Sequence, residues 1–278
     1  FELCRDQGFV MEQKPFSVGV RIEHPQTAIN QAQWGKAAKH PALGAAEYKL
    51  AVHLPTGRSV YTFCMCPGGE VVAAASEAGG IVTNGMSRYA RAGKNANSAV
   101  LVNVDPADFG SSDVLAGVQL QRSIEQAAFR VSAEHGGKPY EAPAQRVGDF
   151  LGTGTAKRGQ GPQPTYARGV VEAPIAECFP KFVSDSLAEA LPLLGRKLKG
   201  FDDPNALMTA PETRSSSPVR ICRGRDFQAR FAKPGAETEE LPGNGVFPCG
   251  EGPGYAGGIM SAACDGLRVA AKVAERYC

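Results

Sequence analysis

The chain has 278 residues, enough for one large domain or two small ones with a buried core. Its 30 Lys and Arg residues nearly balance 28 Asp and Glu residues, so no single-signed field favours nucleic acid or an acidic membrane as a partner. Hydrophobic residues make up 43% of the chain, yet no apolar run approaches the roughly 18 residues of a membrane helix, and we expect no membrane partner.

Alternating residues predict β-strands in the first part of the chain. Over residues 16–22, apolar side chains alternate with polar or small ones, the pattern of a strand with one buried face. Residues 48–54 and 60–65 flank a turn at Gly57 and predict a hairpin. Further strands are predicted at 71–75, 81–83 and 99–104. We therefore expect residues 45–104 to form one mostly antiparallel sheet.

Helical spacing appears in the middle of the chain. Apolar residues recur at steps of three or four over residues 113–136, with Asp113 or Ser112 as the N-cap. Residues 152–164 are rich in Gly, Lys, Gln and Pro and predict an exposed loop.

The last hundred residues combine helices and short strands. Helical spacing returns over residues 174–198, where Pro180 and Pro192 favour two short helices over one long helix. Short strands are predicted at 219–222 and 246–249.

A polar excursion is expected at 228–243, and a final helix is expected from about residue 257. The expected buried stripe of this helix consists of Ile259, Ala262, Ala263, Ala270, Val273 and Ala274.

The cysteines indicate a reducing compartment. Eight cysteines are too few for a disulfide-stapled scaffold, and the absence of CxxC pairs predicts no metal site. We expect a cytoplasmic protein, or an organellar (plastid) one if a transit peptide lies upstream. Cys64 and Cys66 lie two residues apart on a predicted strand, hence on one face. They either act together or simply line a sheet face as small buried residues.

A glycine-rich stretch at residues 249–259 leads into the final predicted helix. Glycines at such a position let a ligand approach the backbone, where unpaired N–H groups and the helix dipole favour an anion. The carboxylate of Glu251 can accept hydrogen bonds from sugar-type hydroxyls. The alternative is a tight turn without a ligand.

The run GVFPCGEGPGYAGGIMSAA at residues 245–263 resembles the C-terminal flavin segment of an uncharacterised family of FAD-dependent dehydrogenases, relatives of the glutathione-reductase-type flavoproteins. Other stretches resemble the family in the same order. They are PFSVGVRIEHPQ (15–26), YTFCMCPGG (61–69), VTNGMS (82–87), NANSA (95–99), APAQRVGDF (142–150) and ETRSSSPVR (212–220).

The resemblance implies an α/β fold. Residues 1–25 and 206–278 would belong to an FAD-binding Rossmann-type domain, to which the second segment contributes its C-terminal strand and helix. Residues 26–205 would form a mostly antiparallel β and helical insert that shapes the substrate site. The family's first βαβ unit, with its pyrophosphate turn, would lie upstream of this sequence. The run Gly152-Thr153-Gly154 follows no predicted strand, so we do not take it as a dinucleotide fingerprint.

FAD is the cofactor that the resemblance implies. In related flavoproteins an acidic residue, which looks like Glu251 here, holds a ribityl hydroxyl, and amides that look like those of Gly258 and Ile259 approach the flavin ring. The expected cofactor-binding residues are Gly250, Glu251, Gly257, Gly258 and Ile259.

Three residues are candidates for catalysis. Cys64 and Cys66 could face the flavin ring. Arg214 could bind a substrate carboxylate through its guanidinium, or it could pair with Glu212 on an exposed loop.

Other polar residues could contact a ligand or simply satisfy backbone groups. His24 is either an acid–base group or a structural histidine. The polar loop candidates are Asn84, Ser87, Asn95, Asn97 and Gln145.

These patterns predict the C-terminal portion of an FAD-dependent oxidoreductase that closes over the flavin. Its expected partners are FAD, a small-molecule substrate and, as a further candidate, NAD(P)H. The alternative is an inactive cofactor-capping or interaction module.

Overall fold

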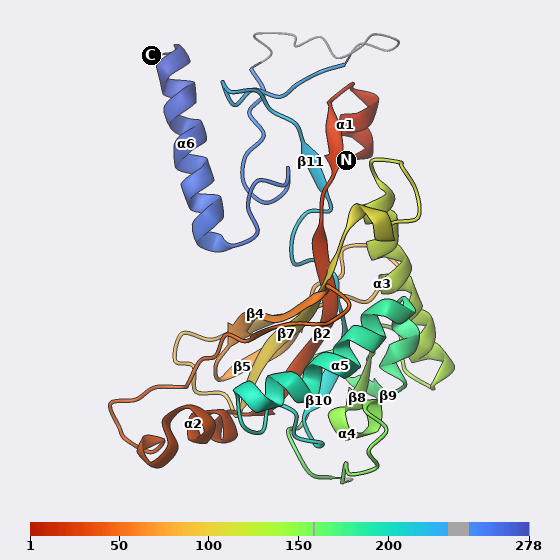
Figure 1. The fold of residues 1–278 in the computed structure, drawn as a ribbon, viewed down its shortest axis with the longest axis vertical. Coiled ribbons are helices and arrows are strands. Elements are labelled where there is room, and N and C mark those ends of the chain that lie inside the picture. Colours follow the sequence, from red (N-terminus) through yellow and green to blue (C-terminus); the bar gives the residue numbers. More distant parts are fainter. Residues whose placement is uncertain (158, 233–244, 278) are drawn as a thin grey trace. The chain divides into compact units, whose positions relative to one another are not determined.

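The computed structural model describes residues 1–157, 159–232 and 245–277 (Figure 1). They form two compact units. The first unit contains Phe1–Phe16, Val104–Gln121 and Arg214–Cys278, and the second contains Ser17–Asn103 and Arg122–Thr213. No helix among these residues is long and apolar enough to cross a membrane.

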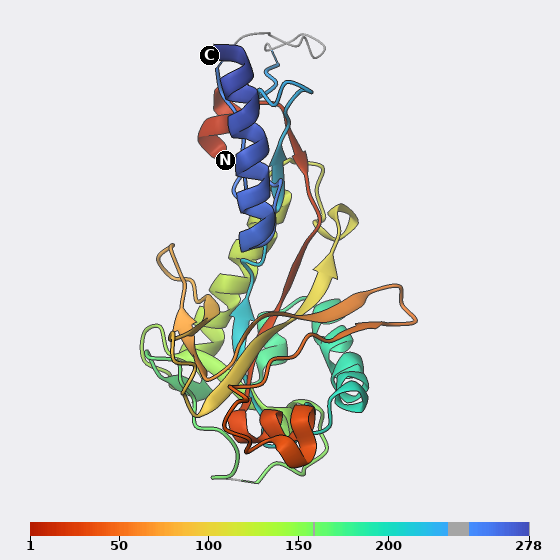
Figure 2. The ribbon, with the colours of Figure 1, turned by 90° about the vertical axis from the view of Figure 1, so that its left-hand side faces the viewer.

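The second unit is organised by a seven-stranded sheet with the order β3-β4-β7-β2-β10-β8-β9. Strand β10 pairs antiparallel with β2 and β8, β4 pairs antiparallel with β3 and β7, and β9 is parallel to β8. The edge hairpin β3–β4 projects from the sheet (Figure 2). The strands are β2 (Phe16–Pro25), β3 (Ala51–His53), β4 (Ser59–Cys66), β7 (Asn95–Val104), β8 (Ala142–Arg146), β9 (Val170–Glu172) and β10 (Leu207–Glu212).

The predicted hairpin is confirmed, but the prediction of one sheet over residues 45–104 is wrong. Strands β5 (Gly69–Ala73) and β6 (Thr83–Ser87) form a separate two-stranded ribbon. Strand β6 packs against β4 and β10 of the main sheet. Alternation alone does not say which strands are hydrogen-bonded neighbours, because a ribbon packed on a sheet has the same period.

Strand β2 is confirmed but is buried on both faces, whereas its alternation predicted one exposed face. Its polar residues Ser17, Arg21 and Glu23 are 5%, 0% and 0% exposed. Central strands that are covered on both sides need not alternate in polarity, and here the second face carries buried charges.

The predicted helix at 113–136 is confirmed as α3 (Ala116–Glu134), which runs from the first unit into the second. The loop at 152–164 is also confirmed for its described residues. The polar stretch after Pro25 forms α2 (Gln26–Trp34), which has no apolar stripe to reveal it. Shorter helical elements of the second unit are η1 (Gly35–Ala37), α4 (Val147–Phe150) and η3 (Ile175–Cys178).

The prediction of two short helices over 174–198 is wrong at Pro192. This proline lies inside the single helix α5 (Lys181–Lys197), and Phe179 and Pro180, the N-cap of α5, separate α5 from η3. A proline in a helix costs about 3 kcal/mol. The fully buried side chains Leu187, Leu191 and Leu194 flank it and keep the helix packed against β3 and β4.

In the first unit, β1 (Met11–Gln13) pairs antiparallel with β11 (Val219–Ile221), which confirms the strand predicted at 219–222. The strand predicted at 246–249 does not form, since Pro248 lacks an N–H for a ladder. Most of the predicted polar excursion at 228–243 lies outside the described residues. The remaining elements are α1 (Glu2–Asp6), η2 (Pro106–Asp108) and α6 (Ile259–Tyr277).

Helix α6 confirms the predicted final helix, but its predicted apolar stripe is not buried. Ile259 is 90% exposed, and the buried residues are Asp265 and Val269. The reason is the ion pair of Asp265 with Arg223, 42 residues away, which decides which side of the helix packs against its own unit.

Candidate functional site

A buried arginine is the centre of the most polar part of the second unit. The Arg21 Nε and Nη2 atoms donate to the two carboxylate oxygens of Glu212 at 2.6 and 2.9 Å. Nη2 also donates to Asn84 Oδ1 at 2.9 Å, and Nη1 donates to the Cys64 carbonyl oxygen at 2.8 Å. Arg21 therefore joins β2 to β10, β6 and β4 through a bidentate ion pair and two further hydrogen bonds.

Burial governs the electrostatics of this ion pair. Desolvation raises the pKa of Glu212 to about 7, while the charge and hydrogen bonds of Arg21 act in the opposite direction. The carboxyl can therefore change its protonation near neutral pH, although it lies beside a permanent cation.

A β-bulge separates the two cysteines that the sequence placed on one strand face. The β4–β7 register shifts between Phe63 and Cys66, and Cys64 has a φ of 42°, in the left-handed region. The side-chain period of two in a strand does not hold across a bulge, so the prediction that Cys64 and Cys66 lie on one face is wrong. Cys64 is exposed, whereas Cys66 is buried and its Sγ donates to the Cys64 carbonyl oxygen at 3.2 Å. Burial also raises the pKa of Cys66.

Asn97 lies opposite Cys66 on β7 and is fully buried. Neither its Oδ1 nor its Nδ2 has a hydrogen-bond partner among the described residues. Gly85 of β6 covers it closely, because a Cβ on Gly85 would lie 2.3 Å from Asn97 Oδ1 and 2.7 Å from Arg21 Nη1. Unsatisfied buried amides are rare and mark this position as unusual.

The other polar candidates make hydrogen bonds within the described part of the chain. The ring Nε2 of His24 lies 2.7 Å from the Phe201 carbonyl oxygen, and burial lowers the pKa of this histidine. Asn95 donates to Glu23 and to the Gln163 carbonyl. Ser87 donates to the Pro67 carbonyl oxygen, and Gln145 accepts from the Ile175 backbone N–H.

In the first unit, an ion pair anchors the glycine-rich loop. Asp265 of α6 accepts from Arg223 at 2.6 and 3.1 Å and from the Gly250 backbone N–H at 2.9 Å. The Arg223 guanidinium also lies over the rings of Tyr255 and Phe227, at 3.6 and 4.3 Å from their centroids. The Gly250 amide is therefore engaged within the chain.

The rest of the loop is open. Glu251 is exposed, and Gly257 and Gly258 are half-buried just before α6. The Gly258 N–H donates to Ser261 Oγ at 3.1 Å, which fixes the start of the helix. The loop thus presents an exposed carboxylate in the segment that leads into a 19-residue helix, and Lys14 lies close enough to interact with it by charge.

Sequence reasoning missed two features. Gly252, Gly254 and Gly257 have GxGxxG spacing before α6, but the described residues 245–251 directly before them form no strand, which a dinucleotide fingerprint requires. The ion pair between Arg21 and Glu212 was also missed. Its only sequence signal is that both residues lie in the stretches that resemble the family.

Arg214 lies in the first unit and is exposed, next to the buried Ser215. Glu212, the partner that the sequence suggested for it, has both carboxylate oxygens bonded to Arg21. Among the residues described, no three His, Cys, Asp or Glu side chains are grouped to hold a metal ion.

Asp265→Ala should loosen the glycine-rich loop. We expect the free energy of unfolding to fall by about 1–3 kcal/mol, since Arg223 and the Gly250 amide lose a charged acceptor. Hydrogen bonds from Arg223 lower the pKa of Asp265, so its contribution exists above the ordinary value of 3.8 and is lost as the pH falls through the lower folded value. Denaturant unfolding measures the change. Glu275→Ala, an exposed change on the same helix, is the control, and equal stability of the two variants would contradict the anchoring role.

The sequence of most of the chain, residues 15–215, matches a known family. The sequence model of the family described as "FAD-dependent protein, C-terminal domain-like" matches residues 15–215, and the chain belongs to this family. It is also 42% identical over 278 residues to an uncharacterised protein of Clostridium beijerinckii. That match covers 100% of this chain and 49% of the relative, so the chain spans about half the relative's length.

The loop before α6 fits the cofactor that the family implies. A carboxylate suits the hydroxyls of a ribityl chain, and backbone amides at a helix start suit a polar ring edge or an anion. A Cβ would meet no atom within 4 Å at Gly250 or Gly252, so the loop surface is not filled by this chain's own atoms.

Proposed function

We propose that this chain is the part of an FAD-dependent oxidoreductase that holds the ribityl and ring end of the flavin and contributes the substrate side of the site. The observation that carries the proposal is the anchored loop before α6, which exposes the carboxylate of Glu251. Glu251 accepts a ribityl hydroxyl. The amides of Gly257, Gly258 and Ile259 lie at the ring end, where the helix dipole favours negative charge.

The flavin supplies hydride or electron transfer when it is bound. The chain's own residues orient the reactants. The exposed thiol of Cys64 is the candidate reacting group, held by the bulge whose carbonyl Arg21 binds. Cys66 supports it from the buried side, and Arg214 binds a substrate carboxylate. NAD(P)H as the electron donor and the relation to glutathione-reductase-type enzymes belong to the same proposal.

The test is Glu251→Ala in FAD-loaded protein. We expect weaker FAD retention, by about 1–3 kcal/mol, the usual cost of removing a charged hydrogen-bond partner. Equilibrium dialysis with flavin fluorescence measures it. Glu275→Ala, exposed on the same unit but away from the loop, should leave retention unchanged. Unchanged flavin content in the Glu251 variant would exclude the ribityl role.

An inactive capping or interaction module is the second candidate. It is favoured by the exposed apolar side chains of α6, where Met260 and Leu267 are 75% and 73% exposed. The chain purified by itself tests this view. A capping module predicts no stoichiometric flavin absorbance near about 450 nm, and tight flavin retention by the chain alone would contradict it.

A further inference from the structure

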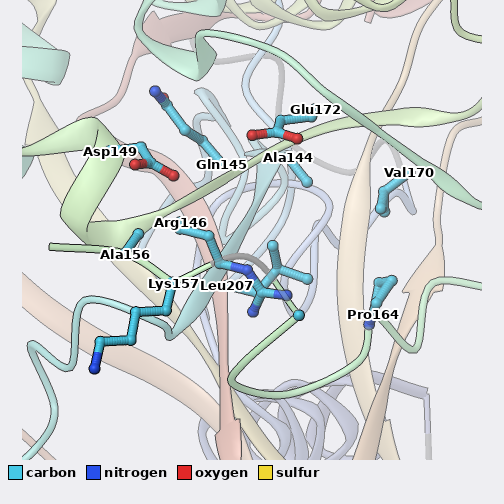
Figure 3. Close-up of a pocket in the computed structure, with 11 residues that line it drawn as sticks. Ala144, Gln145, Arg146, Asp149, Ala156, Lys157, Pro164, Val170, Glu172 and Leu207 are labelled. Atoms are coloured by element: carbon cyan, nitrogen blue, oxygen red, sulfur yellow. The ribbon is translucent and has the colours of Figure 1, made fainter. Parts of the chain in front are cut away.

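A pocket in the second unit lies outside both arrangements described above. It has a volume of about 510 Å³ and lies where β8, β9 and α4 meet the loop before β9 (Figure 3). Ala144 and Leu207, both buried, provide an apolar part of its lining. Its volume is in the range of small-molecule sites, which combine apolar walls with a few polar groups.

Arg146 supplies a fixed cation to this pocket. Its Nη1 donates to the carbonyl oxygens of Pro162 and Asn205 at 3.0 and 2.7 Å, so the guanidinium is held between two loop segments. Its Nε and Nη2 have no hydrogen-bond partner among the residues that the structure describes. These two atoms form the side of the guanidinium that binds a carboxylate in bidentate fashion.

Two carboxylates line another part of the same pocket. Asp149 of α4 and Glu172 of β9 lie on the same side of it, with Gln145 beside them, and the guanidinium of Arg146 lies apart from them (Figure 3). Within the described ranges neither carboxylate has a side-chain hydrogen bond or an ion pair within 4.0 Å. The buried Glu23, and after it Glu172 and Asp149, act on Arg146 by charge, which opposes the lowering of its pKa by burial. Lys157 lines the rim, and its ammonium end extends away from these groups (Figure 3).

We propose that this pocket binds a zwitterionic small molecule of the α-amino acid type. The ligand's carboxylate binds the free edge of Arg146, its ammonium group lies between Asp149 and Glu172, and its side chain lies on Ala144 and Leu207. A simple anion would be repelled by two carboxylates, and a simple cation by the guanidinium. Only a ligand with both charges satisfies the two ends of the pocket.

This site is separate from the proposed flavin function. Calorimetric titration of the 278-residue chain with each of the common L-amino acids at up to about 10 mM tests it. We expect at least one to bind. Its deaminated acid and its decarboxylated amine, which keep the same side chain, should each bind about 10-fold more weakly or worse. Binding of no amino acid, or equal binding of either single-charge analogue, would overturn the proposal.

Substitutions of the pocket residues test where the amino acid binds. Asp149 and Glu172 are exposed, so Asp149→Asn and Glu172→Gln should fold normally, and each should weaken binding of the amino acid by about 10-fold. Glu134→Gln, an exposed change at the end of α3, should leave binding unchanged. Arg146→Lys keeps the charge but loses the bidentate edge and should also weaken binding. Normal binding in all three pocket variants would contradict the site, whatever the flavin content of the protein.

Discussion

Replacing Arg21 with methionine is expected to lower the free energy of unfolding by about 3–5 kcal/mol, the largest effect that we predict for a single residue. The change leaves Glu212 buried without its cation, and Asn84 and the Cys64 carbonyl each lose one of their donors. Urea unfolding of the purified chain measures it. Lys181→Met breaks an exposed ion pair with Asp185 and should change stability little, so equal losses in the two variants would contradict a structural role for Arg21.

The raised pKa of Glu212 makes the free energy of unfolding depend on pH, both with Arg21 present and in this variant. The folded pKa of Glu212, about 7, lies above its ordinary value of 4.5, so the folded state binds this proton more tightly. Stability from this group therefore falls as the pH rises from about 4.5 to about 7. Without Arg21 the pKa rises further, and the fall should continue above neutral pH. The double variant Arg21→Met/Glu212→Leu should lose this slope and regain part of the stability.

Gly85→Ala is expected to cost about 1–3 kcal/mol through overpacking. The added Cβ would lie 2.3 Å from Asn97 Oδ1 and 2.7 Å from Arg21 Nη1, and Arg21 is held by its own hydrogen bonds. The β5–β6 ribbon must therefore move away from the sheet. Urea unfolding again provides the measurement.

Gly44→Ala is the matched control for this substitution. A Cβ there meets nothing within 4 Å, so the variant should be neutral or slightly more stable. A Gly85→Ala variant as stable as the Gly44→Ala variant would show that the ribbon does not pack tightly on Arg21.

The sequence predicts the exposed glycine-rich loop but not the buried network around Arg21. The glycine-rich run before α6 is local in sequence, so its composition sufficed to locate a candidate ligand loop. The network around Arg21 joins residues up to 191 positions apart, and no local pattern encodes such a pairing. The alternation in β2 even suggested that Arg21 faces solvent.

The sequence by itself determined the elements whose signals are periodic and local: strand β2, the β3–β4 hairpin, and helices α3 and α6. Tertiary structure alone decided the rest. It buried both faces of β2, kept Pro192 inside α5, turned Cys64 outward at a bulge, and directed α6 through the ion pair of Asp265. Each of these outcomes depends on a partner distant in the chain, whose burial or charge outweighs a local preference of a few kcal/mol at most.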